Sequence, residues 1–391
     1  MPVAALRDLL ELADAGVWGD EDPASGTSVL RSTNFRADGR LDFVNLSFRK
    51  LEEPKRTQKT LRVGDILLEK SGGGPKQPVG RVCLFRGHEQ PHAFGNFLSR
   101  LRPRRDVVEP EYLFYRLWHF HDQGLTTSYQ KQTSGIRNLE TKRYLQLLID
   151  VPPLSEQRRV VDLLSRAENI VRMRREAEQK AKEIILALFL EMFGDPAKNP
   201  KGWDIARVED CCTLVRGSSP RPQGDPRYFG GPVPRLMIAD ITRDGIYVTP
   251  RIDSLTPAGA ERSRPMKCGD VVMAVSGACG LPAILAVDAC IHDGFVGFRS
   301  LNERIRAEYL CTFLAVIREE TEKQAVGATF QNLKTDQIRA WKIPIPPIQI
   351  QDSFVARAKS LRRLGDDIAH ASRYADSTFQ SLLTLVFGEA V

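Results

Sequence analysis

The sequence of 391 residues has few of the residues and motifs that usually carry catalysis. Its six histidines never occur at metal-ligand spacing, and its seven cysteines are odd in number and form no C-x-x-C pair. The glycine-rich segment 71–76 lacks the spacing of a phosphate-binding loop, and neither a G-x-S-x-G nor an H-E-x-x-H motif occurs. A glycine-rich methyl-donor loop and an Asn/Asp-Pro-Pro-aromatic segment are also missing. We therefore expect no catalytic centre, no metal and no cofactor.

Long apolar runs are missing as well. No stretch of about 18 apolar residues occurs, and acidic residues interrupt the apolar residues of segment 1–16. We therefore expect a cytoplasmic protein without a membrane partner. Apolar residues make up 42% of the chain and charged residues 27%, which is typical of a folded globular protein. The length exceeds what one hydrophobic core usually serves, so we expect two domains with connecting elements.

Positive charge is concentrated in the first third of the chain. The net charge is +7, and between Arg31 and Arg105 there are 17 Lys and Arg residues against 7 Asp and Glu. Such a basic stretch suits contact with the phosphates of a nucleic acid. A solvated cationic surface is the alternative, and charge alone does not exclude it.

The chain contains an internal repeat. Segment 151–157 (VPPLSEQ) recurs as 345–351 (IPPIQIQ), and segment 187–194 (ALFLEMFG) recurs as 381–388 (SLLTLVFG), both displaced by 194 positions. Upstream, the displacement grows, to 197 positions for Glu-Tyr-Leu at 111–113 and 205 for Gly-Asp at 64–65. Insertions in the loops of a variable domain would cause this drift, whereas a helix of fixed length tolerates none. Each half is therefore predicted to be a globular domain followed by a long helix.

The two repeated helices have the apolar spacing of a coiled coil. Each begins after Pro-Pro, which cannot continue a preceding helix, and apolar residues then recur at steps of three and four. Helix 155–193 would be about 58 Å long at ~1.5 Å per residue, so we expect an antiparallel pair rather than a helix buried in one small domain. Two unrelated amphipathic helices are the alternative. The apolar positions include Val160, Leu164, Val171, Ile185, Leu188, Phe354, Leu361, Ile368, Phe379 and Leu382.

Polar and basic residues gather in Gly, Pro and Ser loops, which suits contact with DNA grooves and backbone. The clearest loops are 216–221 (RGSSPR) and 128–138, and segment 327–332 occupies the place equivalent to the latter. Ordinary hydrophilic surface loops are the alternative. The corresponding loop of the first half, 16–22, is acidic, which leaves its contact with DNA open. The candidate DNA-binding residues are Arg31, Asn34, Lys70, Ser71, Lys76, Gln77, Gln130, Lys131, Ser134, Arg137, Arg216, Ser218, Ser219, Arg221, Ser276 and Gln331.

The order of these motifs resembles the specificity subunit of type I restriction–modification enzymes over essentially the whole chain. The matching motifs are Pro-Pro-Leu-Ser-Glu-Gln, a long helix, Phe-Gly-Asp-Pro, Trp203 and the domain with loop 216–221. The resemblance implies that two target recognition domains each read one half of a split double-stranded DNA site. It also implies that the paired helices set the spacing and dock two methyltransferase subunits and the restriction subunits, which perform adenine methylation and ATP-driven cleavage.

We therefore predict two α/β (α+β) recognition domains, 1–150 and 195–344, joined by long antiparallel helices at 151–194 and 345–391, with an internal pseudo-twofold repeat. The predicted function is DNA recognition and scaffolding without catalysis. Two alternatives remain at this point. A stand-alone DNA-processing enzyme would turn over substrate without partners, and a coiled-coil adaptor would show no salt-dependent affinity for DNA.

Overall fold

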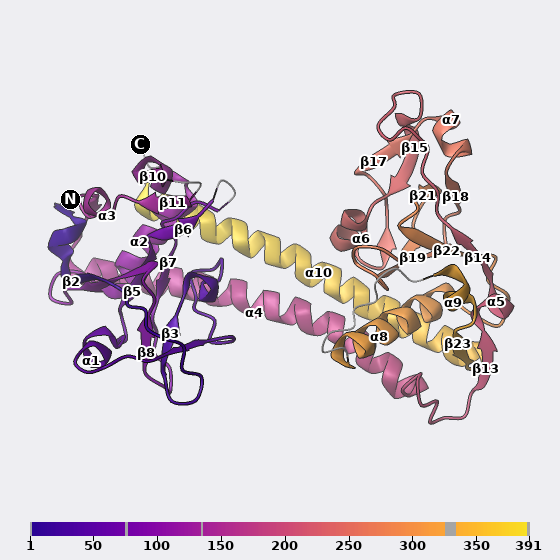
Figure 1. The fold of residues 1–391 in the computed structure, drawn as a ribbon, viewed down its shortest axis with the longest axis horizontal. Helices are drawn as coiled ribbons and strands as arrows, with labels where there is room; N and C mark the ends of the chain where they lie inside the picture. Colours follow the sequence, from indigo (N-terminus) through magenta and orange to yellow (C-terminus); the bar gives the residue numbers. More distant parts are fainter. Residues whose placement is uncertain (1, 75–76, 134–135, 325–333, 389–391) are drawn as a thin grey trace. The chain divides into compact units, whose positions relative to one another are not determined.

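The computed structural model describes residues 2–74, 77–133, 136–324 and 334–388. Their contacts divide the chain into two compact units, Met1–Arg174 with Ala371–Val391 (unit 1) and Arg175–His370 (unit 2). Two helices of 40 residues each, α4 (Leu154–Phe193) and α10 (Ile348–Phe387), contribute to both units (Figure 1). Unit 1 contains the beginning of α4 and the end of α10, and unit 2 contains the reverse, so the helix segments in each unit are antiparallel. Among the described residues, no helix has the length and apolar character needed to cross a bilayer.

Unit 1 is a mixed α/β domain. An antiparallel four-stranded sheet has the order β2 (Leu10–Ala15), β9 (Leu98–Pro103), β5 (Ile66–Glu69), β7 (Val82–Leu84). Two three-stranded sheets follow, β4 (Ser47–Arg49), β3 (Thr27–Leu30), β8 (His92–Phe94) and β10 (Gln130–Thr133), β11 (Ile136–Leu139), β6 (Ser71–Gly73). Strand β1 (Val3–Ala5) pairs with β12 (Leu148–Asp150), and the α-helices are α1 (Lys55–Lys59), α2 (Pro110–Asp122) and α3 (Thr141–Tyr144).

Unit 2 repeats this plan, and each of its two main sheets has one more strand than its counterpart in unit 1. The first sheet has the order β14 (Thr213–Arg216), β22 (Phe295–Arg299), β19 (Val271–Ala274), β20 (Pro282–Leu285), β16 (Tyr247–Val248). The second has the order β17 (Asp253–Leu255), β15 (Phe229–Leu236), β21 (Ala289–Ile291), β18 (Arg264–Met266), and β13 (Asp204–Arg207) pairs with β23 (Lys342–Ile345). The shorter helices are α5 (Val208–Cys211), α6 (Ile238–Asp244), α7 (Pro257–Glu261), α8 (Ala307–Gln324) and α9 (Thr335–Arg339).

Strand registers show that the two domains are copies. Ile66 of β5 pairs with Leu101 of β9, and Val271 of β19 pairs with Phe298 of β22 in the same way. Likewise, β1 and β12 of unit 1 correspond to β13 and β23 of unit 2, and in each unit this strand pair leads into a long helix. The predicted fold class, two α/β copies joined by long antiparallel helices, is confirmed.

The long helices are packed against their domains as well as against each other. In unit 1, Leu164 of α4 and Leu383 of α10 are fully buried in one core with residues of α2. In unit 2, Phe189 of α4 and Phe354 of α10 are fully buried in a core with Tyr309 of α8. Each helix therefore buries a wider face than a two-stranded coiled-coil seam would. This explains why neighbours of the predicted apolar positions, such as Phe189 beside Leu188, are the more deeply buried residues.

A buried glutamine fastens the domain of unit 1 to the start of its helix. Gln157 is 0% exposed and lies in the first turn of α4. Its Oε1 accepts from the backbone N–H of Glu109 at 2.8 Å, and its Nε2 donates to the carbonyls of Val107 at 3.0 Å and Pro152 at 2.8 Å. One side chain thus pairs three polar backbone groups that lie just before α2 and α4.

Unit 2 contains the same fastening. Gln351 is also 0% exposed, accepts from the backbone N–H of Arg306 at 2.9 Å, and donates to the carbonyls of Arg304 at 2.9 Å and Pro346 at 2.8 Å. Each of these partners is the repeat equivalent of a partner of Gln157. The repeat therefore retains a polar side chain at this position because of the hydrogen bonds that it makes. We call each arrangement a domain–helix joint. The first comprises Gln157, its backbone partners and the contacts that α4 makes with its domain through residue 168, and the second comprises Gln351, its backbone partners and the contacts of α10 through residue 362.

We expect Gln157→Ala and Gln351→Ala to lower the free energy of unfolding by about 3 kcal/mol each, because each leaves three buried backbone groups without a partner. Urea unfolding of the whole chain measures the loss. Gln179→Ala is the matched control, because Gln179 is exposed on α4 and donates to Glu183 of the same helix; its effect should stay below about 0.5 kcal/mol. Equal effects for a buried site and the control would contradict the role of the joint.

Candidate nucleic-acid interface

Loop 216–221 of unit 2 is held tightly against the turn that follows β21. The N–H of Gly217 donates to the carbonyl of Phe295 at 2.9 Å, and the N–H of Ser218 donates to Ile291 at 3.1 Å. A Cβ atom on Gly217 would lie 1.9 Å from the carbonyl oxygen of His292, so only glycine permits this approach. The loop is therefore a fixed platform rather than a free surface segment.

The acidic loop 16–22 of unit 1 has the same backbone geometry. The N–H of Gly16 donates to Leu98 at 3.0 Å and that of Val17 to Phe94 at 2.9 Å, and a Cβ on Gly16 would lie 2.1 Å from the carbonyl oxygen of Gly95. The sequence places this loop at the position of 216–221 and leaves open only whether it contacts DNA. The hydrogen bonds show that Gly16 is the structural equivalent of Gly217.

Exposed arginines surround the platform in unit 2. Ser218 Oγ donates to the carbonyl of Arg262 at 3.2 Å, Ser263 Oγ donates to the carbonyl of Ser218 at 2.8 Å, and Arg264 Nε donates to the carbonyl of Arg216 at 3.0 Å. These bonds bring Arg262 and Arg264, which the sequence analysis missed, next to the predicted residues. Their only sequence signal is the Arg-Ser-Arg triplet, and nothing local links it to a loop 44 residues away. The exposed guanidinium groups belong to Arg216, Arg221, Arg227, Arg262 and Arg264.

The hydroxyl of Ser219 is part of a polar network beneath these arginines. Ser219 Oγ donates to Asp293 Oδ1 at 2.6 Å and accepts from Arg235 Nη2 at 2.9 Å, and Arg235 also pairs with Asp253 at 2.5 Å. The hydrogen bond from Ser219 lowers the pKa of Asp293, and burial together with Arg235 lowers the pKa of His292. Both shifts keep Asp293 ionised and His292 neutral near pH 7, so the cationic character of this surface comes from arginine.

The platform of unit 1 carries different side chains on the same frame. Lys59 Nζ donates to the carbonyl of Ala15 at 2.8 Å, as Arg264 does to Arg216 in unit 2, and it also pairs with Asp14 at 2.6 Å. Where unit 2 has Ser219, unit 1 has Trp18, which is 45% exposed and lies with its ring 4.0 Å from the guanidinium carbon of Arg49. An exposed aromatic residue stacked on a cation is suited to contact with bases or sugars.

One small sheet unites several predicted residues of unit 1. Strand β6 pairs with β11, and Ser71 Oγ bonds to the amide oxygen of Asn138. Gln130 Nε2 donates to the carbonyl of Val79 at 3.1 Å, Lys131 pairs with Glu140, and Arg137 is half-buried on β11. Burial and the nearby Lys59 lower the pKa of Lys70 at the end of β5. Gln77 is exposed just beyond β6. Lys76, Ser134 and Gln331 lie outside the described residues.

Other predicted residues have contacts within their own domain. Asn34 is buried: its Oδ1 accepts from the N–H of Arg31 at 2.9 Å, and its Nδ2 donates to the carbonyl of Asp42 at 3.0 Å. In unit 2 the buried Asp240 accepts from Met237 N–H at 3.1 Å in the same place. This position therefore caps a turn in both copies. Arg31 Nη2 donates to the carbonyl of Asn45 at 3.0 Å, and Ser276 is half-buried before Gly277.

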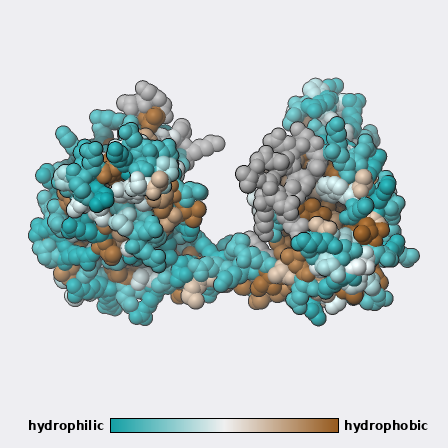
Figure 2. All heavy atoms as spheres, turned by 60° about the horizontal axis from the view of Figure 1, so that its bottom comes forward, coloured by the Kyte–Doolittle hydropathy of each residue, from teal (hydrophilic) through white to brown (hydrophobic). Residues whose placement is uncertain are grey.

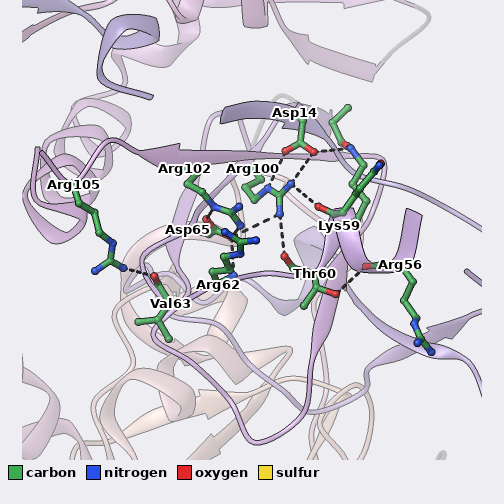
Figure 3. Close-up of polar contacts among 12 residues, drawn as sticks. Asp14, Arg56, Lys59, Thr60, Arg62, Val63, Asp65, Arg100, Arg102 and Arg105 are labelled. Carbon is green, nitrogen blue, oxygen red and sulfur yellow. Dashed lines mark hydrogen bonds and ion pairs between the residues drawn. The ribbon is translucent and has the colours of Figure 1, made fainter. Parts of the chain in front are cut away.

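Much of the positive charge of the basic stretch is neutralised inside unit 1. Figure 3 shows Arg100 and Arg102 between Asp14 and Asp65. Arg100 is 1% exposed and pairs with Asp14 at 2.9 Å, and Arg102 pairs with Asp65 at 2.7 Å. The excess of ten cations already subtracts the acids of the stretch, such as Asp65, but it still overstates what the stretch offers to phosphates. Two carboxylates from outside it, Asp14 and Glu168, also pair with its cations.

The surface of each unit is largely hydrophilic on the face seen in Figure 2, with apolar residues scattered among polar ones. The exposed apolar residues of the first part of α4 include Leu163, Ile170 and Met173. The apolar positions predicted on α4 and α10, the helices expected to dock partner subunits, are buried or half-buried within their units.

Comparison with known proteins finds similar chains both in sequence and in structure. Residues 200–372 match the model of the type I restriction modification DNA specificity domain. The chain is 24% identical over 389 residues to the type I restriction enzyme MjaX specificity subunit of Methanocaldococcus jannaschii, covering 95% of this chain and 88% of that one. It is 23% identical over 173 residues to the EcoKI specificity subunit of Escherichia coli, covering 42% and 37% of the two chains.

Solved structures have the same fold. A chain from a structure describing complex assembly and conformational transition of the type I R-M system aligns with a TM-score of 0.60 at 21% identity, covering 99% of this chain and 97% of that one. The S subunit of a type I restriction-modification system from M. genitalium aligns with a TM-score of 0.56 at 12% identity, covering 100% and 96%. The chain is therefore similar to type I restriction enzyme specificity subunits over nearly its whole length, and it shares the fold of their solved structures.

Proposed function

We propose that this chain is the non-catalytic subunit that reads a split double-stranded DNA site and holds the methyltransferase and restriction subunits on it. The observation that carries the proposal is the duplicated platform, built by the same hydrogen bonds from Gly16 and Gly217 in the two domains. One chain thus has two equivalent frames on which side chains can contact DNA. Their different side chains fit half-sites of different sequence, because base choice depends on the donors and acceptors presented.

In unit 2, the exposed arginines of the platform suit phosphate contacts and bidentate contacts with guanine, with the fixed Ser219 between them. In unit 1, Trp18 with Arg49 occupies the corresponding place, and the small sheet with Ser71 and Arg137 supplies further polar groups. The acidic residues beside Trp18 disfavour phosphate contact there, so we assign this platform to base or sugar contacts.

The proposed assembly contains two methyltransferase subunits, one for each half-site, together with restriction subunits in the cytoplasm. We place the docking of methyltransferases on exposed residues of the long helices, such as Leu163 and Ile170, because most of the apolar positions predicted on these helices belong to the cores. A methyl-transfer or cleavage assay on the purified chain without partners tests the alternative of a stand-alone enzyme, and any turnover would contradict the proposal.

Neutralising the platform of unit 2 should weaken DNA binding in a salt-dependent way. For Arg221→Gln/Arg262→Gln we expect the slope of log affinity against log salt to fall by about two units, since each lost phosphate contact removes about one. Arg207→Gln/Lys342→Gln is the matched control. These exposed residues are partners in the β13–β23 ladder and are not among the residues of the platform. Fluorescence anisotropy with DNA carrying the methylated site gives both slopes. An unchanged slope in the first variant would remove the platform from the interface.

Lengthening both long helices should lengthen the spacer between half-sites. A Cβ on Gly365 of α10 would lie 3.8 Å from Ala181 Cβ of α4, so inserts after Ala181 and before Gly365 would be neighbours. Seven residues in each add about 10 Å at ~1.5 Å per residue and keep the heptad phase, which corresponds to roughly three base pairs. Four-residue inserts, which break the phase, are the control and should impair assembly. Mapping methylated sites reads out the spacer, and an unchanged spacer in a well-assembled seven-residue variant would show that the helices do not set it.

A further inference from the structure

The two domain–helix joints share their neutral contacts but carry opposite charges. Beside Gln157, Arg158 of α4 pairs with Glu109 of the domain at 2.5 Å. At the equivalent positions of unit 2, beside Gln351, Asp352 of α10 pairs with Arg306 at 2.6 Å. The helix contributes the cation in the first joint and the anion in the second.

A second pair of equivalent positions, further along each long helix, is also inverted, but in the opposite sense. Glu168 of α4 is 9% exposed and pairs with Arg40 at 2.9 Å and with Arg86 at 3.3 Å, and it accepts from Tyr115 Oη at 2.6 Å. The residue 194 positions later is Arg362 of α10. Its guanidinium carbon lies 5.6 Å from the ring centroid of Tyr247. Here the helix contributes an anion to the first joint and a cation to the second.

Tyr247 is the structural equivalent of Arg40. The carbonyl before Arg40, on Gly39, accepts from Leu84 N–H, and the carbonyl before Tyr247, on Ile246, accepts from Ile284 N–H. Leu84 pairs with Ile66 as Ile284 pairs with Val271, so the two bonds correspond. By the same register, Arg86 corresponds to Ala286. In unit 1, Arg40 and Arg86 lie around the carboxylate of Glu168. In unit 2, the equivalent positions around the guanidinium of Arg362 are the ring of Tyr247 and the small residue Ala286.

Tyr247 is also tied to a carboxylate. Its Oη donates to Glu308 Oε1 at 2.8 Å, which orients the phenol and places negative charge near Arg362. An electron-rich ring with a carboxylate beside it attracts a guanidinium. The same surroundings would repel a carboxylate, and those of Glu168, with two arginines, would repel a guanidinium.

We propose that these inverted pairs match each recognition domain to the helix that follows it. The exchangeable module of this chain is then a domain together with the first turns of its helix, through residue 168 or 362, rather than a domain alone. A domain moved from one position to the other without these helix residues would place Arg306 against Arg158 and the ring of Tyr247 against Glu168. Like charges in contact, and a buried charge without its partner, both oppose this arrangement.

The proposal is tested by converting the first joint to the pattern of the second in the full-length chain. Glu168→Arg alone, and Arg40→Tyr/Arg86→Ala alone, should each lower the melting temperature of unit 1, Glu168→Arg by on the order of 10 °C. The triple variant recreates the matched set of unit 2 and should recover at least half of the combined loss. Asp162→Arg, a charge reversal at an exposed site on the same helix, is the control and should shift the melting temperature by less than about 2 °C.

Two further cycles keep the test decisive if the buried variants fail to fold. In unit 2, Arg362→Glu is combined with Tyr247→Arg/Ala286→Arg. At the exposed rim, Arg158→Asp is combined with Glu109→Arg, where folding tolerates change. In each cycle we expect the combined variant to be more stable than the sum of its parts predicts. Additive losses in the cycles that fold, measured by differential scanning calorimetry, would overturn the proposal.

Discussion

The buried glutamine of each joint is the contact on which the rest of the architecture depends. Gln157 and Gln351 pair backbone groups that no other described side chain satisfies, and they do so where the chain passes from domain to long helix. A polar side chain in a core is costly unless it is fully paired, and here all its bonds go to the backbone. The direction in which each domain meets its helix is thus fixed by hydrogen-bond geometry, which apolar packing alone would leave looser.

On this fixed frame the two copies differ in chemistry. The glycine that lets the platform approach the neighbouring turn is present in both copies. Two residues later, one copy has the exposed Trp18 and the other has the half-buried Ser219. A frame set by backbone bonds allows side chains at the platform to change without disturbing the fold. This separation explains how one architecture could read unrelated half-sites, and the inverted charges of the joints show that the copies have also diverged where they meet their helices.

The sequence was sufficient for the features that repeat or follow a period. The displacement of 194 residues predicted both long helices, and Arg216 to Arg221 marked the platform of unit 2. What could not be predicted depends on contacts between distant residues. Folding brings carboxylates from outside the basic stretch, Asp14 and Glu168, to Arg100 and Arg40, so the charge of these arginines was counted as available when it is not. Asn34 is a turn cap that a loop composition cannot distinguish from a DNA contact, and Arg262 reaches the platform only through Ser218.

The central claim is that each domain reads its own half of a split site. The most direct measurement replaces residues 203–362, the second domain with the first turns of its helix, with the matching segment of a relative. The chimera is assembled with its methyltransferase partners, and methylated adenines are mapped across a genome. The account predicts that one half of the methylated site changes while the other half is retained, because base contacts confined to one domain cannot specify distant bases. A chimera that is folded and active but changes both halves would contradict it.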